Sequence, residues 1–140
     1  MFNLVINDYD RQVYEKELKP FLPKDFIDIH THVWLNTMTP AGDSNGGATW
    51  TDIMADEMSA EQLQDAFKRL FPENNVTPLV FGGVGQVVKE ANDYVYDCAK
   101  KFHFPVLTRT DYSMDADALA RVVNMKPPWT WRLARPCRTL

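Results

Sequence analysis

Three short apolar segments, each followed by a segment with helical periodicity, constrain the fold of this 140-residue chain more than any other feature. The apolar segments lie at residues 26–34, 76–81 and 104–108. The helical patterns follow them at residues 59–70, 85–102 and 115–124. Because a strand–helix–strand unit forms a right-handed crossover, this order predicts an α/β fold with a parallel sheet.

The helix expected at residues 59–70 has the clearest boundaries. Its start is a capping box, Ser59-Ala60-Glu61-Gln62, in which serine and glutamine satisfy each other's backbone amides. The apolar residues that follow are spaced at i, i+3, i+4 and i+7, and Pro72 ends the pattern. A shorter helix is predicted upstream, from Asp8 to Leu18.

The first apolar segment, Phe26 to Trp34, contains two histidines two residues apart. Side chains on a strand alternate between its faces, and second neighbours lie about 7 Å apart. The alternation predicts one face that packs under helices and one that carries polar groups. The apolar face is Ile27, Ile29 and Val33, and the polar face is Asp28, His30 and His32.

Two imidazoles at one strand end are half of a divalent-metal site, since neutral imidazole is a common zinc ligand. Structural zinc takes four protein ligands and catalytic zinc usually three. The remaining ligands would come from His103 or from an Asp, Glu or Cys. The alternative is that one or both rings hydrogen-bond within a core.

Charge divides the chain into a body and a tail. Up to residue 125 there are 11 basic and 19 acidic residues, and from Lys126 onward there are four basic residues and no acid. We expect a lead-in at 1–23, an α/β body at 24–124 and an irregular basic tail at 125–140. The overall charge of −4 argues against a nucleic-acid partner.

The compartment follows from what the sequence lacks. It has no apolar run of membrane-spanning length and no signal-peptide pattern at the N-terminus, and its two cysteines form no disulfide framework. We therefore expect a cytoplasmic protein without membrane contact.

Two architectures fit the strand–helix repeat. In an open doubly wound sheet, Phe81 to Val88 would be a dinucleotide loop, with Asp111 as the ribose-binding acid. Val88 stands where that motif needs a third glycine, which favours a simple glycine turn. In a (β/α)₈ barrel, functional residues lie at the C-terminal strand ends. The residues at those ends are His30, His32, Gly82, Gly83 and Arg109.

Asp28-Ile29-His30-Thr31-His32-Val33-Trp34 resembles the first-strand signature of the amidohydrolase-related family, which belongs to the metal-dependent amidohydrolase superfamily. That branch includes aminocarboxymuconate semialdehyde decarboxylase, resorcylate decarboxylases and pyrone dicarboxylate lactonases. Ala91 to Val95 resembles the Asn-x-Tyr-Val turn of the family's second helix, and Ser59 to Leu70 resembles its first. The resemblance covers residues 24–124.

The resemblance implies a divalent metal, zinc by preference, bound by His30 and His32. In the family, a histidine from a middle strand and an aspartate from the last strand complete the site. Asp28 would orient an imidazole as a hydrogen-bond acceptor, and Arg109 would hold a substrate carboxylate. The substrate would be a small carboxylate-bearing or carbonyl compound. No catalytic residue can be assigned in this chain.

A complete barrel takes about 250 residues, and this chain supplies about three of its eight βα units. The later ligands have no counterpart here. We therefore expect the N-terminal portion of such an enzyme, inactive alone, from a truncated or frame-shifted gene. A homo-oligomer could complete the two-histidine site. The alternatives are a non-enzymatic remnant or interaction module and, less favoured, a dinucleotide-binding domain.

Overall fold

The structure of this chain is a computed structural model that describes residues 4–38, 55, 57–83, 86–110 and 113–124. Two parallel strands form its sheet, β1 (Asp25–Val33) and β2 (Asn75–Gly82). Helix α3 (Ala60–Leu70) lies between them in the chain, and α4 (Val88–Phe102) follows β2. The predicted α/β class with parallel strand pairing is confirmed.

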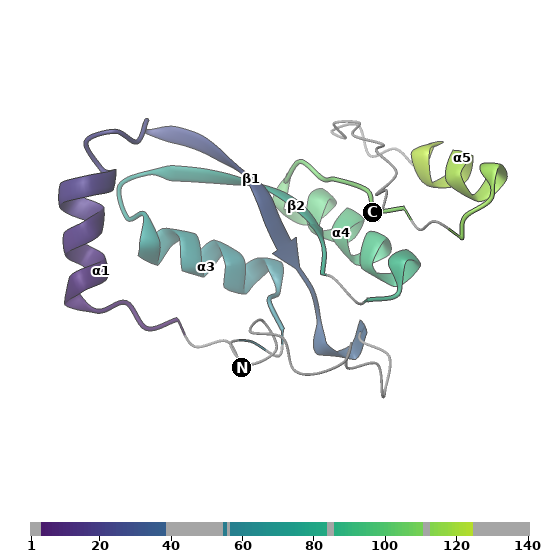
Figure 1. The fold of residues 1–140 in the computed structure, drawn as a ribbon, viewed down its shortest axis with the longest axis horizontal. Coiled ribbons are helices and arrows are strands. Elements are labelled where there is room, and N and C mark those ends of the chain that lie inside the picture. Colours follow the sequence, from purple (N-terminus) through teal and green to yellow (C-terminus); the bar gives the residue numbers. More distant parts are fainter. Residues whose placement is uncertain (1–3, 39–54, 56, 84–85, 111–112, 125–140) are drawn as a thin grey trace, which may run out of the picture.

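The smaller elements lie at the two ends of the sheet (Figure 1). Helix α1 (Asp8–Val13) continues into a turn of π-helix, η1 (Tyr14–Leu18), beside the end where both strands begin. A 3₁₀ turn, η2 (Asn36–Met38), follows β1. Helix α5 (Ala116–Asn124) lies at the opposite end of the molecule from α1.

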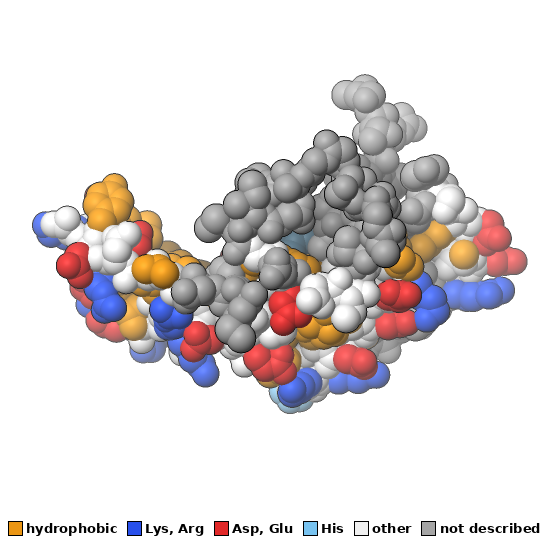
Figure 2. All heavy atoms as spheres, turned by 90° about the horizontal axis from the view of Figure 1, so that it is seen from below, with side chains coloured by type: hydrophobic (Ala, Val, Ile, Leu, Met, Phe, Trp, Pro, Cys, Tyr) orange, Lys and Arg blue, Asp and Glu red, His pale blue; other side chains and the backbone are white. Residues whose placement is uncertain are grey.

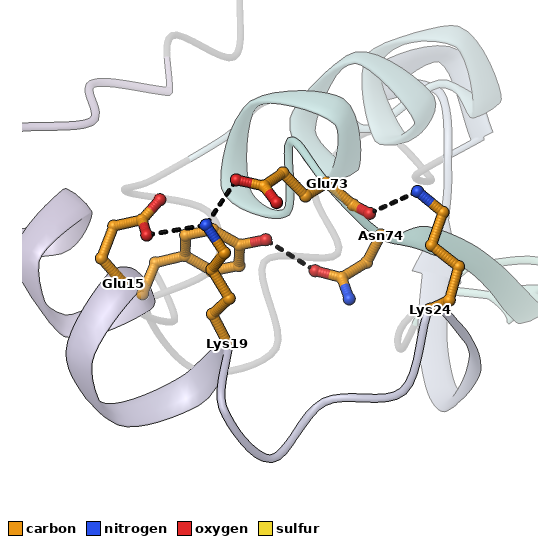
Figure 3. A network of polar contacts seen from close by, with 6 residues as sticks. Glu15, Lys19, Lys24, Glu73 and Asn74 are labelled. Carbon is orange, nitrogen blue, oxygen red and sulfur yellow. Dashed lines mark hydrogen bonds and ion pairs between the residues drawn. The ribbon is translucent and has the colours of Figure 1, made fainter.

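Side chains of the lead-in segment, together with Lys24, tie the start of the chain to the α3–β2 turn (Figure 3). The Tyr14 hydroxyl donates to Asn74 Oδ1 at 2.7 Å, and the Lys19 ammonium contacts the Glu73 carboxylate. The Lys24 ammonium donates to the Glu73 carbonyl at 3.0 Å. The lead-in therefore packs on the α3–β2 turn.

One hydrophobic core joins both long helices to the same face of the sheet. Val33 and Val80 project from the two strands and are fully buried. Leu63 of α3 and Val95 of α4 pack in the same cluster. The helices α3 and α4 therefore cover one face.

The opposite face of the sheet corrects one prediction. Ile27 is 60% exposed and Ile29 is 74% exposed, so the predicted apolar face of Ile27, Ile29 and Val33 under helices is wrong. The reason is a bulge in β1. Asp28 pairs with Pro78 and Thr31 with Val80, so β1 advances three residues while β2 advances two.

An extra residue in a strand reverses which residues face each side from that point onward. Before the bulge Ile27 and Ile29 face away from the helices, and after it Thr31 and Val33 face toward them. The alternation of apolar and polar residues in the sequence cannot show this reversal of the faces of β1. His32, which pairs with Phe81, consequently lies on the open face together with the exposed isoleucines.

The predicted third strand at 104–108 is reduced to one parallel bridge, Val80 to Val106. Val80 N–H donates to the Pro105 carbonyl, and Leu107 N–H donates to the Val80 carbonyl, both at 2.9 Å. Pro105 has no N–H, which limits the pairing of this segment. The segment still runs beside β2 in the same direction.

The helix starts follow local chemistry. The predicted capping box of α3 is present, with Gln62 N–H donating to Ser59 Oγ at 3.2 Å and Ser59 N–H to Gln62 Oε1 at 2.7 Å. Helix α4 begins at Val88, three residues later than predicted.

None of the helices in the described part of the chain has the length and apolar character needed to cross a membrane. Two predicted features lie outside the described residues: Asp111 and the tail at 125–140.

Acidic and basic side chains are interspersed over the face seen in Figure 2. Lys101 pairs with Glu61 across two helices, and Lys89 pairs with Asp93 within α4. Exposed pairs of this kind contribute roughly 0 to 1 kcal/mol each. The stability of the fold therefore rests on the core rather than on surface charge.

Candidate functional site

The C-terminal ends of the strands bring two of the predicted site residues, His32 and Arg109, close together. The His32 ring nitrogen Nδ1 lies 2.9 Å from the Gly82 carbonyl oxygen. The Arg109 guanidinium donates to the carbonyl of the next residue, Gly83. The side chains of His32 and Arg109 are therefore anchored one residue apart at the end of β2.

The two imidazoles also lie side by side at this strand end. The ring centroids of His30 and His32 are 5.3 Å apart. Phe81 lies beside both rings, with its centroid 5.2 Å from His30 and 4.1 Å from His32. The three rings form a compact aromatic group at the strand end.

The hydrogen bond at Gly82 determines which nitrogen of His32 faces outward. A carbonyl oxygen only accepts hydrogen bonds, so Nδ1 carries the proton and Nε2 keeps its lone pair. Burial lowers the pKa of the His32 imidazole below its usual value, and the positive charges of His30 and Arg109 lower it further. The bond to Gly82 opposes this shift. The result is a largely neutral imidazole with a defined tautomer.

This geometry fits half of a zinc site. Two imidazoles bound tetrahedrally to one zinc, with Zn–N bonds of about 2.1 Å, place their ring centroids about 5 Å apart. The observed 5.3 Å agrees with that value. Among the described residues, no group of three or more His, Cys, Asp or Glu side chains could hold a metal. A metal ion held by His30 and His32 would therefore need its other ligands from outside the described residues.

Arg109 is held by its backbone as well as by its side chain. Asn92 Oδ1 accepts the Arg109 N–H at 3.0 Å, and Asn92 Nδ2 donates to the Arg109 carbonyl at 2.9 Å. Asn92 is only 4% exposed, so these bonds are shielded from water. The amide of α4 thereby fixes the end of the 104–108 segment against the helix.

Two other predicted residues lie around this centre. Asp28 Oδ1 accepts the backbone N–H of His30 at 3.0 Å, so within the described chain its carboxylate contacts the bulge and not an imidazole ring. His103 is the exposed C-cap of α4, with a left-handed φ of 57°. That position is at the far end of α4 from the strand ends, so His103 does not join His30 and His32.

Sequence reasoning recognised Asn92 and Tyr94 as motif residues but did not predict their contacts. Asn92 clamps Arg109, and the Tyr94 hydroxyl accepts the Ala60 N–H at 3.2 Å at the start of α3. Gln86, which binds Gly83, was missed entirely. Asn92 and Tyr94 could have been noticed as polar residues at helix positions where an apolar residue would be expected. Gln86 could have been noticed as a polar residue next to a glycine turn.

No protein-family model matches this chain, and no curated protein or solved structure matches it. The resemblance to the amidohydrolase-related family therefore rests on the sequence motifs alone.

Proposed function

We propose that this chain carries the first two metal ligands of a metal-dependent hydrolase or decarboxylase of the amidohydrolase-related family. In this proposal β1, β2 and the 104–108 segment correspond to the first three strands of a (β/α)₈ barrel. The remaining ligands come from outside the described residues. The described part of the chain is inactive without them.

The observation that carries the proposal is the arrangement of His30 and His32. Their ring separation of 5.3 Å suits one tetrahedral metal ion, and Gly82 holds His32 in the tautomer that leaves Nε2 for a metal. Both residues stand at the C-terminal end of a parallel strand, where barrel enzymes place their active sites.

The chain's own residues would divide the work at such a centre. A bound zinc supplies Lewis acidity, which lowers the pKa of water or polarises a substrate carbonyl. His30 and His32 hold the ion, and Gly82 orients the second ring. Arg109, on the same edge, binds the acidic part of a substrate. Whether the reaction is hydrolysis or decarboxylation depends on the group held over the metal.

Zinc stoichiometry tests the proposal. The purified full chain is dialysed against Zn²⁺ and then against metal-free buffer, and retained zinc is measured by mass spectrometry. We expect about one zinc per chain or per pair of chains. His30→Ala and His32→Ala should each lose most of the metal, because each removes one of the two imidazoles.

The matched control is His103→Asn. It removes the exposed third histidine, and asparagine tolerates the left-handed backbone of that position. Zinc content should be unchanged in this variant. Equal zinc retention by wild type, His30→Ala and His32→Ala would contradict the proposal.

The uncovered sheet face favours one alternative from another class. Ile27 and Ile29 are large, exposed and adjacent to the histidines. Such a patch is typical of a surface that another protein segment covers, as in an interaction module or a non-enzymatic remnant. This alternative predicts that zinc binding is absent while substitution of the isoleucines changes self-association, which sedimentation velocity measures.

A further inference from the structure

The peptide group between Gly82 and Gly83 is bonded to a side chain on each of its two sides. Its carbonyl oxygen, on Gly82, lies 2.9 Å from Nδ1 of His32. Its N–H, on Gly83, donates to Oε1 of Gln86 at 3.0 Å. Because a peptide group is planar, turning its N–H also turns its carbonyl. The side chains of Gln86 and His32 are therefore connected through a single rigid unit.

The residues on both sides of this peptide group are glycines, which restrict its rotation least. Rotating the group changes ψ of Gly82 and φ of Gly83, and glycine tolerates φ values on either side of zero. The Arg109 guanidinium donates to the Gly83 carbonyl, which belongs to the next peptide group. That contact does not set the direction of the Gly82 carbonyl, whereas an acceptor for the Gly83 N–H does.

Gln86 is itself held in place at the end of β2. It is only 6% exposed, so its bond to Gly83 is shielded from water. It lies two residues before α4, which begins at Val88. This helix approaches β2 closely, since a Cβ added at Gly82 would lie 2.6 Å from that of Ala91. The packing of α4 on β2 therefore keeps Gln86 next to the peptide group that it binds.

We propose that Gln86 is a positioning residue for the proposed metal ligand His32. By holding the Gly83 N–H, it directs the Gly82 carbonyl at Nδ1 of the imidazole and leaves Nε2 for a metal ion. Consecutive hydrogen bonds polarise one another, so the bond to Gln86 also makes this carbonyl a stronger acceptor. The inference rests on the proposed function, because the ion is the one that His30 and His32 bind.

The tautomer of His32 tests this role in the absence of any metal. The metal-free full chain is labelled with ¹⁵N, and both ring nitrogens of His32 are assigned at a pH where the imidazole is neutral. A protonated ring nitrogen and one with a free lone pair differ widely in ¹⁵N chemical shift. We expect the proton on Nδ1 in wild type. In Gln86→Leu the two shifts should move toward each other, because the Gly82 carbonyl is no longer held and the tautomers interconvert.

Two variants separate positioning from a merely structural role. Gln86→Glu keeps an acceptor oxygen for the Gly83 N–H and should retain the wild-type tautomer of His32. Gln62→Leu is the matched control, because Gln62 also accepts a backbone N–H, that of Ser59, at 2.7 Å. It should lower the free energy of unfolding and leave the tautomer of His32 unchanged. A lower unfolding free energy in Gln86→Leu with an unchanged tautomer would overturn the proposal.

The wild-type protein decides the matter if Gln86→Leu does not fold. A proton on Nε2 of His32 in folded wild type would overturn the proposal. So would a Gly83 amide that exchanges with deuterium as fast as in the unfolded chain, because Gln86 would then not hold it. We expect this amide to exchange at least tenfold more slowly than in the unfolded chain.

Zinc affinity is the second measurement, and it separates this inference from the proposed function. Loss of a group that orients a metal-binding histidine typically lowers metal affinity roughly 10- to 100-fold, so Gln86→Leu should bind zinc at least tenfold more weakly. Zinc retention that depends on His30 and His32, with a tautomer that Gln86→Leu does not change, would remove the role of Gln86 and leave the metal centre. A tautomer that depends on Gln86, in a chain that retains no zinc, would remove the metal centre and leave Gln86 as the residue that orients His32.

Discussion

The His32 imidazole of β1 donates from Nδ1 to the Gly82 carbonyl of β2 at 2.9 Å. This bond connects the side chain of one strand to the backbone of its neighbour at the point where both strands end. It determines the tautomer of His32 and the direction of its other nitrogen. The orientation of one proposed metal ligand therefore depends on the pairing of the two strands.

The first prediction concerns the titration of His32 in the metal-free protein. Burial, assisted by the charges of His30 and Arg109, lowers its pKa below 6.5. The unfolded chain then binds more protons than the folded chain between these two pKa values. The contribution of His32 to the free energy of unfolding should be constant above pH 6.5 and should fall as the pH drops from 6.5 to the folded pKa. Urea unfolding at pH 7.5 and pH 5 measures this change.

His32→Gln is the control for that experiment, because it removes the titrating group and keeps a donor for the Gly82 carbonyl. The decrease between pH 7.5 and pH 5 should be smaller in this variant than in wild type. The imidazole proton resonances of His32 give the pKa directly. A value above 6.5 would contradict the expected effect of burial.

The second prediction tests the contact between β2 and α4. A Cβ added at Gly82 would lie 2.6 Å from the Cβ of Ala91, so Gly82→Ala requires the helix and strand to separate. We expect a loss of about 1–3 kcal/mol in the free energy of unfolding, measured by urea denaturation. Adding Ala91→Gly removes the clashing atom and should restore part of the loss.

Gly83→Ala is the matched control for the same experiment. Its added Cβ would lie 3.3 Å from the side chain of Gln86 and 3.4 Å from that of Trp34, contacts that small movements can relieve. It should cost less than Gly82→Ala. A larger cost at Gly83 would show that the helix–strand approach at Gly82 is not the tighter constraint.

The strand–helix order and the capping box of α3 could be predicted because they depend on local residue patterns. The residues at the C-terminal strand ends could be placed close together, because parallel strands end at the same edge of a sheet. The faces of β1 could not be predicted, since the bulge at 28–31 reverses the alternation and depends on pairing with a strand almost 50 residues away. The roles of Asn92 and Gln86 also depend on tertiary contacts.

The third prediction concerns Asn92. Asn92→Ala removes the acceptor of the Arg109 N–H and the donor to the Arg109 carbonyl at a buried position. We expect a loss of roughly 1–3 kcal/mol in unfolding free energy. The Arg109 amide should also exchange with deuterium faster than in wild type. Asp93→Ala, which removes a partly exposed neighbour on α4, serves as the control.

Unchanged exchange at Arg109 in Asn92→Ala would mean that another group holds this backbone segment. In that case the position of the guanidinium would depend on Gly83 rather than on α4. A loss of unfolding free energy without a change in amide exchange at Arg109 would mean that Asn92 stabilises helix α4 alone.

The fourth prediction concerns Asp28, whose carboxylate accepts the His30 N–H at 3.0 Å within the bulge. Asp28→Ala removes this acceptor and should cost about 0.5–1.5 kcal/mol in unfolding free energy. It should also weaken zinc binding severalfold, because the bulge positions His30, whose ring centroid lies 5.3 Å from that of His32. Asp28→Asn keeps an acceptor oxygen and should retain both properties. If Asp28→Asn loses zinc as severely as Asp28→Ala, the charge of the carboxylate matters, and Asp28 acts on an imidazole as the family resemblance implies.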